Sequence, residues 1–518
     1  MHAAADLVIT HAALLTMNDQ QPRATAMAVR GGRIVRVGSD ADVLAMASTD
    51  TRRIDLGGRT VVPGFQDCHL HLLWYGTSLV AEADLVGSRS VDELLSRLSA
   101  HAARRPGWIR GHGFDQEKLD DRRFPSRDDL DRVSRDRPIF ITRVCGHAAI
   151  ANSAALALLT REELDAGDAS TGLYTETAID ALHRRVPPLD DETLEQALLA
   201  ACDVALRTGI TSVQTMLDNI GQWRTYERLH AKRGRLPIRM TIMPPESSAE
   251  QVRDRGFVTG SGDGWLRMGG AKFFSDGSLG ARTALLAQPY ADDASAGLGL
   301  RIYPPEALKR RVAEVAAMGF QIVIHAIGDQ ALRETVDAIE HALAGRSNST
   351  IRHRVEHASV CPPDQLERLA RLGIHTTLQP QFVTSDTWTG ERLGPTRSPW
   401  AYPFASMLRA GVPVGLSSDC PVERLDAFDC IAAAVGRHAW SPAETLTPLE
   451  AIRAYTLGSA ACAHRDGDTG SLAVGKLADL VVLSGDPSSM TPEQLRGLRA
   501  ERVFIGGEEV ALLEGVIP

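Results

Sequence analysis

Paired cysteines are missing from this sequence. Its 518 residues include seven cysteines, and no two of them form a C-x-x-C pair. An odd number of widely spaced cysteines argues against a disulfide framework and favours a reducing compartment. The cysteines are Cys68, Cys145, Cys202, Cys361, Cys420, Cys430 and Cys462.

Excess positive charge and long apolar runs are missing as well. With 56 basic and 65 acidic residues the formal net charge is −9, so the sequence has no excess of basic residues of the kind that binds nucleic acid. No apolar stretch approaches the ~18 residues needed to cross a bilayer. The first residues also lack the basic and apolar regions of a signal peptide. We therefore expect a cytoplasmic protein that binds neither nucleic acid nor membrane.

Short strand patterns are present at both ends of the chain. Apolar or β-branched runs bounded by turn residues occupy 6–10, 26–29, 33–37, 480–483 and 502–505. Neither group can readily bury both of its faces alone. We expect one small β-sandwich domain built from both termini, residues 1–62 and 466–518.

Between the ends, strand and helix patterns alternate. Apolar runs such as 138–142, 321–325 and 412–416 are strand candidates, and helical patterns such as 304–318 and 362–372 lie among them. This alternation predicts an α/β fold with parallel strands, and the length fits a (β/α)8 TIM-like barrel over residues 63–465. A doubly wound open sheet is the alternative, but its Gly-rich phosphate fingerprint is missing. The stretch at about 84–208 is longer than one βα unit needs, so we expect a helical and loop insertion there.

Two histidines, His69 and His71, stand one residue apart after an apolar run with a Pro-Gly turn. On a strand, residues i and i+2 point to the same side, so both imidazoles would face one point. Two converging neutral imidazoles suit a divalent metal such as zinc. A His-X-His pair alone is a weak signal, and its weight depends on further ligands downstream.

Four more apolar runs carry ligand-type residues at or near their ends, namely Lys272, His325, His357 and Asp419. Taken singly, each has an ordinary explanation: a hydrogen-bonded core histidine, a helix N-cap aspartate or a lysine that reaches solvent. Together with His69 and His71, however, they form a set of ligand-type residues that would seldom arise by chance. In a barrel, such strand ends meet at one face, where catalytic groups lie.

Several segments resemble the amidohydrolase superfamily, and specifically the branch that contains the N-substituted formamide deformylases (amidohydrolase family 3). The matching segments are 62–71, 272–279, 355–357, 417–422 and 470–480, and a weaker match that is particular to the branch covers 146–156. The likeness extends over essentially the whole chain. It implies a barrel with a returning β-sandwich, and from the resemblance alone we expect a homodimer.

The resemblance also implies a metal centre. His69, His71 and Asp419 would hold one ion, and His325 and His357 a second. Lys272 would bridge the two ions as a carbamate, because its ammonium form has no lone pair to offer a cation. Zinc is the expected metal, with one or two ions bound. A single-metal site with unmodified Lys272 is the alternative.

The activity implied is hydrolysis of a carbon–nitrogen bond other than a peptide bond. The substrate would be a small-molecule amide, N-formyl, N-acyl or cyclic amide compound. Metal-activated hydroxide would attack the carbonyl, with Asp419 as general base and then general acid. An ester or lactone hydrolase, and a catalytically silent metal-binding barrel, are the alternatives.

Five further residues are candidates for substrate contact. His147 could hydrogen-bond the substrate, although a buried structural role is equally compatible. Asp276 could orient a ligand or belong to a turn, and Gln379 could reach the cleft. Cys145 and Phe114 stand where this branch often has an acidic residue and a tryptophan, so substrate preference could differ here. Cys145 could also be a nucleophile, but no acid beside it in the sequence would orient His147 as its base.

Overall fold

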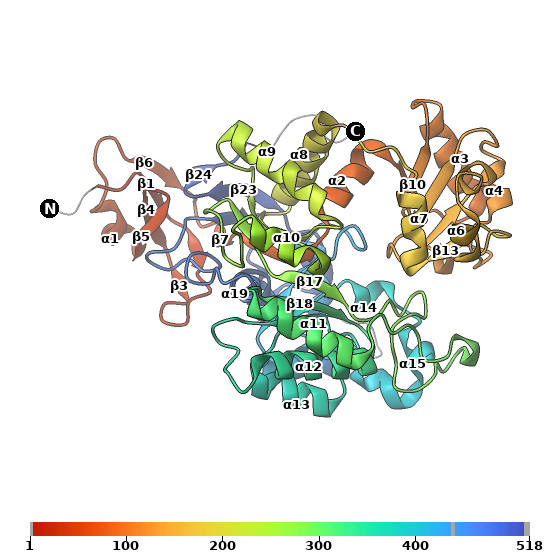
Figure 1. Cartoon of the computed structure of the whole chain (residues 1–518). Helices are drawn as coiled ribbons and strands as arrows, with labels where there is room; N and C mark the ends of the chain where they lie inside the picture. Colours follow the sequence, from red (N-terminus) through yellow and green to blue (C-terminus); the bar gives the residue numbers. More distant parts are fainter. Residues whose placement is uncertain (1–3, 437–440, 512–518) are drawn as a thin grey trace.

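The computed structural model describes residues 4–436 and 441–511. It has a mixed α/β fold, in which the chain ends form strands at one side of the molecule (Figure 1). Residues 1–3 and 512–518 of the predicted terminal unit lie outside the described residues. Within the described ranges, no helix combines the length and apolarity required to cross a membrane.

Strands from both chain ends share one sheet. Strand β7 (Thr60–Pro63) pairs antiparallel with β22 (Leu480–Leu483), with Leu480 opposite Pro63. Buried apolar residues of this six-stranded sheet and of a four-stranded sheet form one cluster, so the two sheets share a core. The other strands of the two sheets are β1 (Leu7–Thr10), β2 (Ala13–Leu15), β3 (Arg23–Ala24), β4 (Ala26–Arg30), β5 (Arg33–Gly38), β6 (Arg52–Asp55), β23 (Ala500–Ile505) and β24 (Glu508–Glu509).

The central strands run parallel to one another in two sheets. One has the order β16-β15-β14-β8 and the other the order β17-β18-β19-β20-β21. Their bounds are β8 (Phe65–Leu70), β14 (Ile210–Met216), β15 (Arg239–Met243), β16 (Leu266–Met268), β17 (Ala271–Phe274), β18 (Ile322–Ala326), β19 (Arg354–His357), β20 (His375–Leu378) and β21 (Val414–Leu416).

Hydrogen bonds link the two central sheets at both of their edges. The Lys272 N–H donates to the Pro244 carbonyl at 2.8 Å, just beyond the end of β15. On the other side, the Asp419 N–H donates to the His69 carbonyl at 2.9 Å. The segment after β21 is therefore held next to β8, and β17 is held next to the segment that follows β15.

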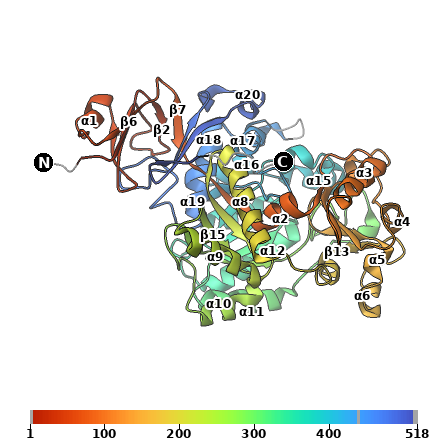
Figure 2. The same cartoon turned by 90° about the horizontal axis from the view of Figure 1, so that it is seen from above.

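Helices connect the central strands and cover them (Figure 2). Sequence signals define some helix ends: α11 begins with Pro305 in its first turn, and α13 ends at Gly373, whose φ of 62° suits glycine. The α-helices of this part are α2 (Leu72–Ala81), α8 (Asp191–Arg207), α9 (Trp223–Arg233), α10 (Ala249–Asp254), α11 (Pro305–Ala317), α12 (Asp329–Leu343), α13 (Pro363–Leu372), α14 (Phe382–Ser385), α15 (Thr389–Arg397), α16 (Phe404–Arg409), α17 (Ala427–Val435), α18 (Pro448–Arg453), α19 (Ser459–Cys462) and α20 (Pro492–Arg496). Helix α1 (Asp40–Leu44) belongs to the terminal part.

The predicted insertion contains a sheet of which the sequence indicated only one strand, the run 138–142, which corresponds to β11 (Ile139–Arg143). Five strands in the order β13-β12-β11-β10-β9 lie between α2 and α8 in the sequence, at the end of the molecule opposite the N-terminal strands β1, β4 and β5 (Figure 1). We expected helix and loop there, but these strands are short and β10 contains two glycines, which weakens its strand pattern. The elements are β9 (Ala83–Asp84), α3 (Val91–Ala102), β10 (Ile109–Phe114), α4 (Arg127–Asp131), β11 (Ile139–Arg143), β12 (Ala148–Ala151), α5 (Ser153–Leu156), α6 (Arg161–Asp165), β13 (Leu173–Thr175) and α7 (Asp180–His183).

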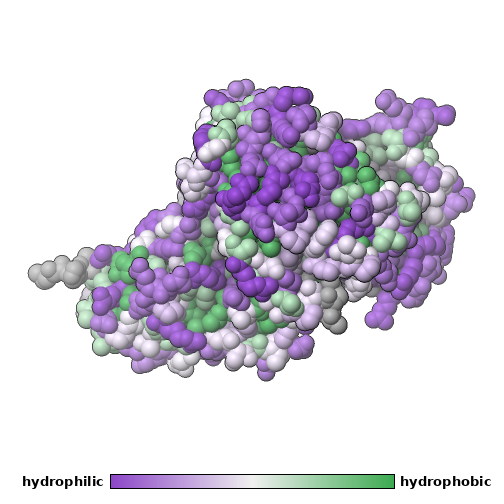
Figure 3. All heavy atoms as spheres, turned by 90° about the horizontal axis from the view of Figure 1, so that it is seen from below, coloured by the Kyte–Doolittle hydropathy of each residue, from purple (hydrophilic) through white to green (hydrophobic). Residues whose placement is uncertain are grey.

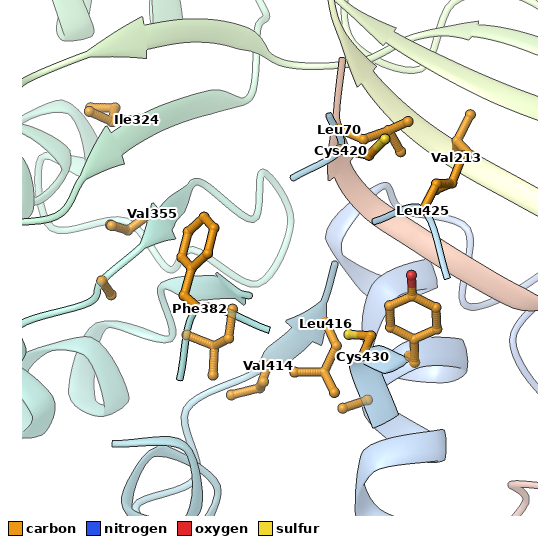
Figure 4. Packing of buried hydrophobic residues seen from close by; sticks show 14 of the residues in the cluster. Leu70, Val213, Ile324, Val355, Phe382, Val414, Leu416, Cys420, Leu425 and Cys430 are labelled. Carbon is orange, nitrogen blue, oxygen red and sulfur yellow. The ribbon is translucent and has the colours of Figure 1, made fainter. Parts of the chain in front are cut away.

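A single large apolar cluster fills the central part. Figure 4 shows side chains from different strands, among them Val213, Ile324 and Leu416, within this cluster. On the face in Figure 3, by contrast, hydrophilic residues predominate and apolar residues are scattered among them. The core therefore fixes the central strands, and with them the side chains at the strand ends.

Candidate active site

Three ligand-type side chains meet where β8 ends and the segment after β21 begins. One ligand atom each of His69, His71 and Asp419 lies within 4.8 Å of the others. Asp419 Oδ1 is 3.3 Å from His69 Nε2 and 3.8 Å from His71 Nε2. The two imidazoles therefore turn the same ring nitrogen toward one carboxylate, which is a spacing that suits a shared cation.

Two histidines and a lysine extend this group. The His357 ring centroid lies 4.9 Å from that of His69 and 4.4 Å from that of His325. Lys272 Nζ is buried without a hydrogen-bond partner and lies 4.6 Å from the centre of the Phe274 ring. Burial lowers the pKa of Lys272 to about 8, because the ammonium form is poorly solvated there.

A carboxylate lies behind each histidine of the His-X-His pair. His69 Nδ1 contacts Glu356 Oε2, while His71 Nδ1 contacts Asp218 Oδ1 at 3.1 Å. Glu356 is fully buried, whereas the Asp218 side chain is 43% exposed. A carboxylate on one ring nitrogen fixes the orientation of the ring and makes the other nitrogen a better ligand. Both Nε2 atoms are thereby directed at Asp419.

Glu356 is itself held in a buried network. Its carboxylate accepts a hydrogen bond from Thr377 Oγ1 at 2.7 Å and forms an ion pair with Arg354 Nε at 2.8 Å. Burial opposes the charged form, but the Arg354 guanidinium and His69 keep the pKa of Glu356 below its usual value. The residue behind His69 is therefore a charged carboxylate.

Gln379 and Asp276 lie behind the other two histidines. Gln379 Oε1 is 2.8 Å from His357 Nδ1, and His325 Nε2 is 3.0 Å from the Gly277 carbonyl. Asp276 accepts the backbone N–H groups of Leu285, Ile327 and Gly328 at 2.8–3.1 Å. Gln379 is 2% and Asp276 0% exposed, and neither lines the cavities described below. The structure thus places both as supports of the histidines and loops.

These side chains fit a divalent cation. The donors are imidazole nitrogens and a carboxylate, a set that zinc accepts. The buried Lys272 nitrogen lacks a partner, and a buried polar atom without one is costly unless something else completes its surroundings. His69, His71 and Asp419 are the residues best placed to hold one ion.

Two cavities meet at this group. The first cavity has a volume of about 1220 Å³ and the second about 900 Å³. Both are lined by His325, His357 and Asp419, so the candidate site lies between them. Cys145 and His147 of the inserted segment also line both cavities, which makes the insertion a wall of the site.

His147 is oriented by an acid that is distant in sequence. Its Nδ1 lies 2.7 Å from Glu176 Oε2, in the 3-10 helix Glu176–Ile179. Burial opposes protonation, but Glu176 raises the pKa of His147 to about 9. The His147 ring centroid is 5.9 Å from that of His325. A protonated imidazole therefore lies beside the metal-binding candidates.

Phe114 lies elsewhere. It is fully buried in the apolar cluster of the inserted sheet, with its ring centroid 6.2 Å from that of Phe124. Neither cavity is lined by it. Its large apolar ring is instead used for packing within the insertion.

Sequence reasoning missed Asp218, Glu356 and Glu176. Asp218 follows the apolar strand β14 just as Asp419 follows β21, so the same strand-end signal was present. Glu356 precedes His357 in a buried strand, where an unpaired carboxylate would be costly. Glu176 offered no comparable signal, because its contact with His147 depends on the fold of the insertion.

Comparison with known proteins gives the family. The family model described as "Amidohydrolase family" matches residues 52–511. The chain belongs to the amidohydrolase family. It is therefore a hydrolase that acts on carbon–nitrogen bonds other than peptide bonds.

Relatives of this amidohydrolase align over almost their full length. YtcJ of Bacillus subtilis (strain 168) is 32% identical over 96% of this chain and 98% of its own. The N-substituted formamide deformylase of Arthrobacter pascens is 29% identical over 97% of both chains. A crystal structure described as an uncharacterized metal-dependent hydrolase from Pyrococcus horikoshii OT3 has a TM-score of 0.80 and 31% identity, covering 94% of this chain and 99% of that one.

Proposed function

We propose that this amidohydrolase cleaves an amide, N-formyl or N-acyl bond of a small molecule at a zinc centre held by His69, His71 and Asp419. The observation that carries the proposal is the convergence of these three side chains within 4.8 Å of one another. His325, His357 and Lys272 complete the centre, with Lys272 as a carbamate where a second ion is bound. The buried Lys272 nitrogen has no hydrogen-bond partner and a lowered pKa, and both observations support that role.

The chain's own residues would move the proton. A bound divalent metal supplies a water whose pKa falls from about 15.7 to about 7, and a charge that polarises the carbonyl. Asp419 accepts the proton of the attacking water and returns it to the leaving nitrogen. Burial opposes the charged form of Asp419, but His69 and His71 hold its pKa below the usual value, so it begins as a carboxylate. His147, whose Nδ1 pairs with Glu176, would donate its Nε2–H to the substrate carbonyl.

The architecture proposed for this activity is a closed (β/α)8 barrel over residues 63–465 with a β-sandwich from both termini. The backbone hydrogen bonds of Lys272 and Asp419 at the two edges support closure. The apolar cluster shared by the two terminal sheets supports the sandwich. In such a barrel the strand ends carry the catalytic groups, as they would here.

The test is an activity screen combined with metal analysis. Purified protein is assayed with N-formyl amines, N-acyl amines, lactams, esters and lactones, with and without added zinc. We expect bound zinc, turnover of open-chain amides, and loss of that turnover after chelation. Turnover of lactones or esters alone would replace the proposal with an esterase, and protein without tightly bound metal or activity would indicate a silent barrel.

Asp419→Asn tests the proton-transfer role. We expect turnover to fall by at least about 100-fold, because a positioned acid–base group is removed. Zinc content and the circular dichroism spectrum are measured on the same samples, so that loss of metal or fold is recognised. Asp364→Asn is the matched control, since that carboxylate is 55% exposed and pairs with Arg333 at the surface. Near-normal turnover of Asp419→Asn with a full zinc complement would remove Asp419 from the reaction.

A further inference from the structure

The candidate site opens into a cavity on each side. The first cavity of about 1220 Å³ and the second of about 900 Å³ both reach Asp419. Pockets that enclose a whole drug-sized ligand measure about 300–1,000 Å³. Either cavity alone could therefore hold a large substituent of the substrate.

A large aromatic side chain is exposed inside the second cavity. Phe274, at the end of β17, is 37% exposed and lines this cavity only. Its ring centroid is 5.3 Å from that of His325 and 4.6 Å from Lys272 Nζ. The part of the Phe274 ring that is open to water is apolar surface, and an apolar group of the substrate would cover it.

A tryptophan and a glycine shape the same cavity. Trp74, on α2, has its ring centroid 5.5 Å from that of His71 and lines the second cavity. Gly146 also lines it, with a φ of 74°, and a Cβ at this glycine would lie 2.7 Å from Trp74 Cη2. The bare backbone of Gly146 thus lets the indole ring stay beside His71. The loop after α7 adds further apolar residues, namely Val186, Pro187, Pro188 and Leu189.

Charged side chains line both cavities. Arg143, Asp115, Asp386 and Glu423 line only the first cavity, and Arg110, Asp180, Arg184 and Asp218 line only the second. Cys145, His147 and Asp419 line both cavities, so the two cavities meet at Asp419. A substrate whose scissile bond lies at Asp419 can therefore place one substituent in each cavity.

From these observations we infer that the substrate is an amide with a sizeable substituent on both sides of the scissile bond, one of them an aromatic or branched apolar group that packs on Phe274 and Trp74 in the second cavity. This inference rests on the proposed function and names its substrate class. A formamide, whose acyl side is a single hydrogen, would leave one cavity empty.

The experiment uses zinc-loaded full-length protein and two series of simple amides. In one series the acyl group grows from formyl to acetyl to benzoyl on a constant amine; in the other the amine grows from methylamine to benzylamine on a constant acyl group. We expect kcat/KM to rise with size in both series, by at least about 10-fold from the smallest to the aromatic member.

Phe274→Ala and Val86→Ala then separate the cavities. Val86 is 49% exposed and lines only the first cavity, so it is the matched control. Phe274→Ala should reduce the ratio of kcat/KM between the aromatic and the smallest member of one series, while the same ratio in the other series stays. Phe274→Leu should regain part of the lost ratio. Val86→Ala should leave the series that depends on Phe274 intact.

Three results would overturn the inference. In the first, kcat/KM falls as either substituent grows. In the second, Phe274→Ala lowers kcat/KM by the same factor for every amide. In the third, Val86→Ala removes the same gain in kcat/KM as Phe274→Ala does. In each case the smallest amide is still hydrolysed, so the proposed function stands. If no amide is hydrolysed by the zinc-loaded protein, the proposed function fails first, and the inference falls with it.

Discussion

Glu356→Gln gives the sharpest test of how the site is held. Glutamine keeps the shape of the side chain but removes the negative charge next to His69. Glu356 is fully buried, and its carboxylate pairs with Arg354 at 2.8 Å and accepts a hydrogen bond from Thr377 at 2.7 Å. The substitution therefore removes a ring-orienting group and leaves a buried guanidinium without its counter-charge.

Two magnitudes follow from this geometry. Loss of a carboxylate behind a metal-binding histidine typically weakens metal affinity or activity by about 10–100-fold. Breaking a buried ion pair by removing one partner costs about 3–5 kcal/mol of folding free energy, because the remaining charge is uncompensated. We expect both effects in Glu356→Gln, since Arg354 and Glu356 are both fully buried.

Zinc competition with a chelator measures affinity, and urea unfolding of the zinc-free protein measures stability. Asp218→Asn is the matched control: it removes the carboxylate behind His71, but that side chain is 43% exposed. It should weaken zinc binding to a similar extent while costing less than about 1 kcal/mol of stability. Wild-type zinc affinity and wild-type stability in Glu356→Gln would refute the reasoning.

Two further predictions concern stability. The His353 Nδ1 atom accepts the Ile322 N–H at 3.0 Å, and burial lowers the pKa of His353 from 6.5 to about 4. The neutral His353 therefore stabilises the fold fully above pH 6.5, and this contribution of about 3 kcal/mol to the free energy of unfolding is lost as pH falls toward 4. Between these pH values the free energy of unfolding should decline less for His353→Gln than for the wild type. An equal decline in both proteins would contradict the assignment. Asp479 binds Arg239 through two hydrogen bonds of 2.6 and 2.9 Å in a buried pair. Asp479→Asn should lower the free energy of unfolding by about 3–5 kcal/mol in a denaturant titration, and a loss below 1 kcal/mol would show that the pair is not needed.

The strand-end residues were predictable because each lies at or near the end of a short apolar run. Periodicity placed 304–318 and 362–372 in helices, close to α11 (Pro305–Ala317) and α13 (Pro363–Leu372). Parallel strands bring their carboxyl ends to one edge, so ligand-type residues there could be grouped without knowing the register. The convergence of His69, His71 and Asp419 is the geometry that this reasoning anticipates.

The supports of these residues could not be predicted in the same way. Thr377 reaches Glu356 because β20 pairs with β19 in the register that sets these two residues opposite each other. Glu356 reaches His69 from a strand that is not its sheet neighbour. Such contacts depend on register and on the shape of the whole sheet, which alternation of apolar residues does not reveal. Apart from the run 138–142, the strands of the inserted sheet were missed because they are short and carry little periodicity.

The path of the chain from β7 to β8 has a consequence for how the enzyme is made. Only Gly64 separates β7, which pairs with β22, from the strand that carries His69. On the ribosome β7 emerges long before β22. Until β22 is made, β7 therefore has β2 as its sheet neighbour on one side and an open edge on the other. A messenger cut short before β22 would yield a protein that has every proposed zinc ligand, while the strand that leads to the first two of them would keep one unpaired edge.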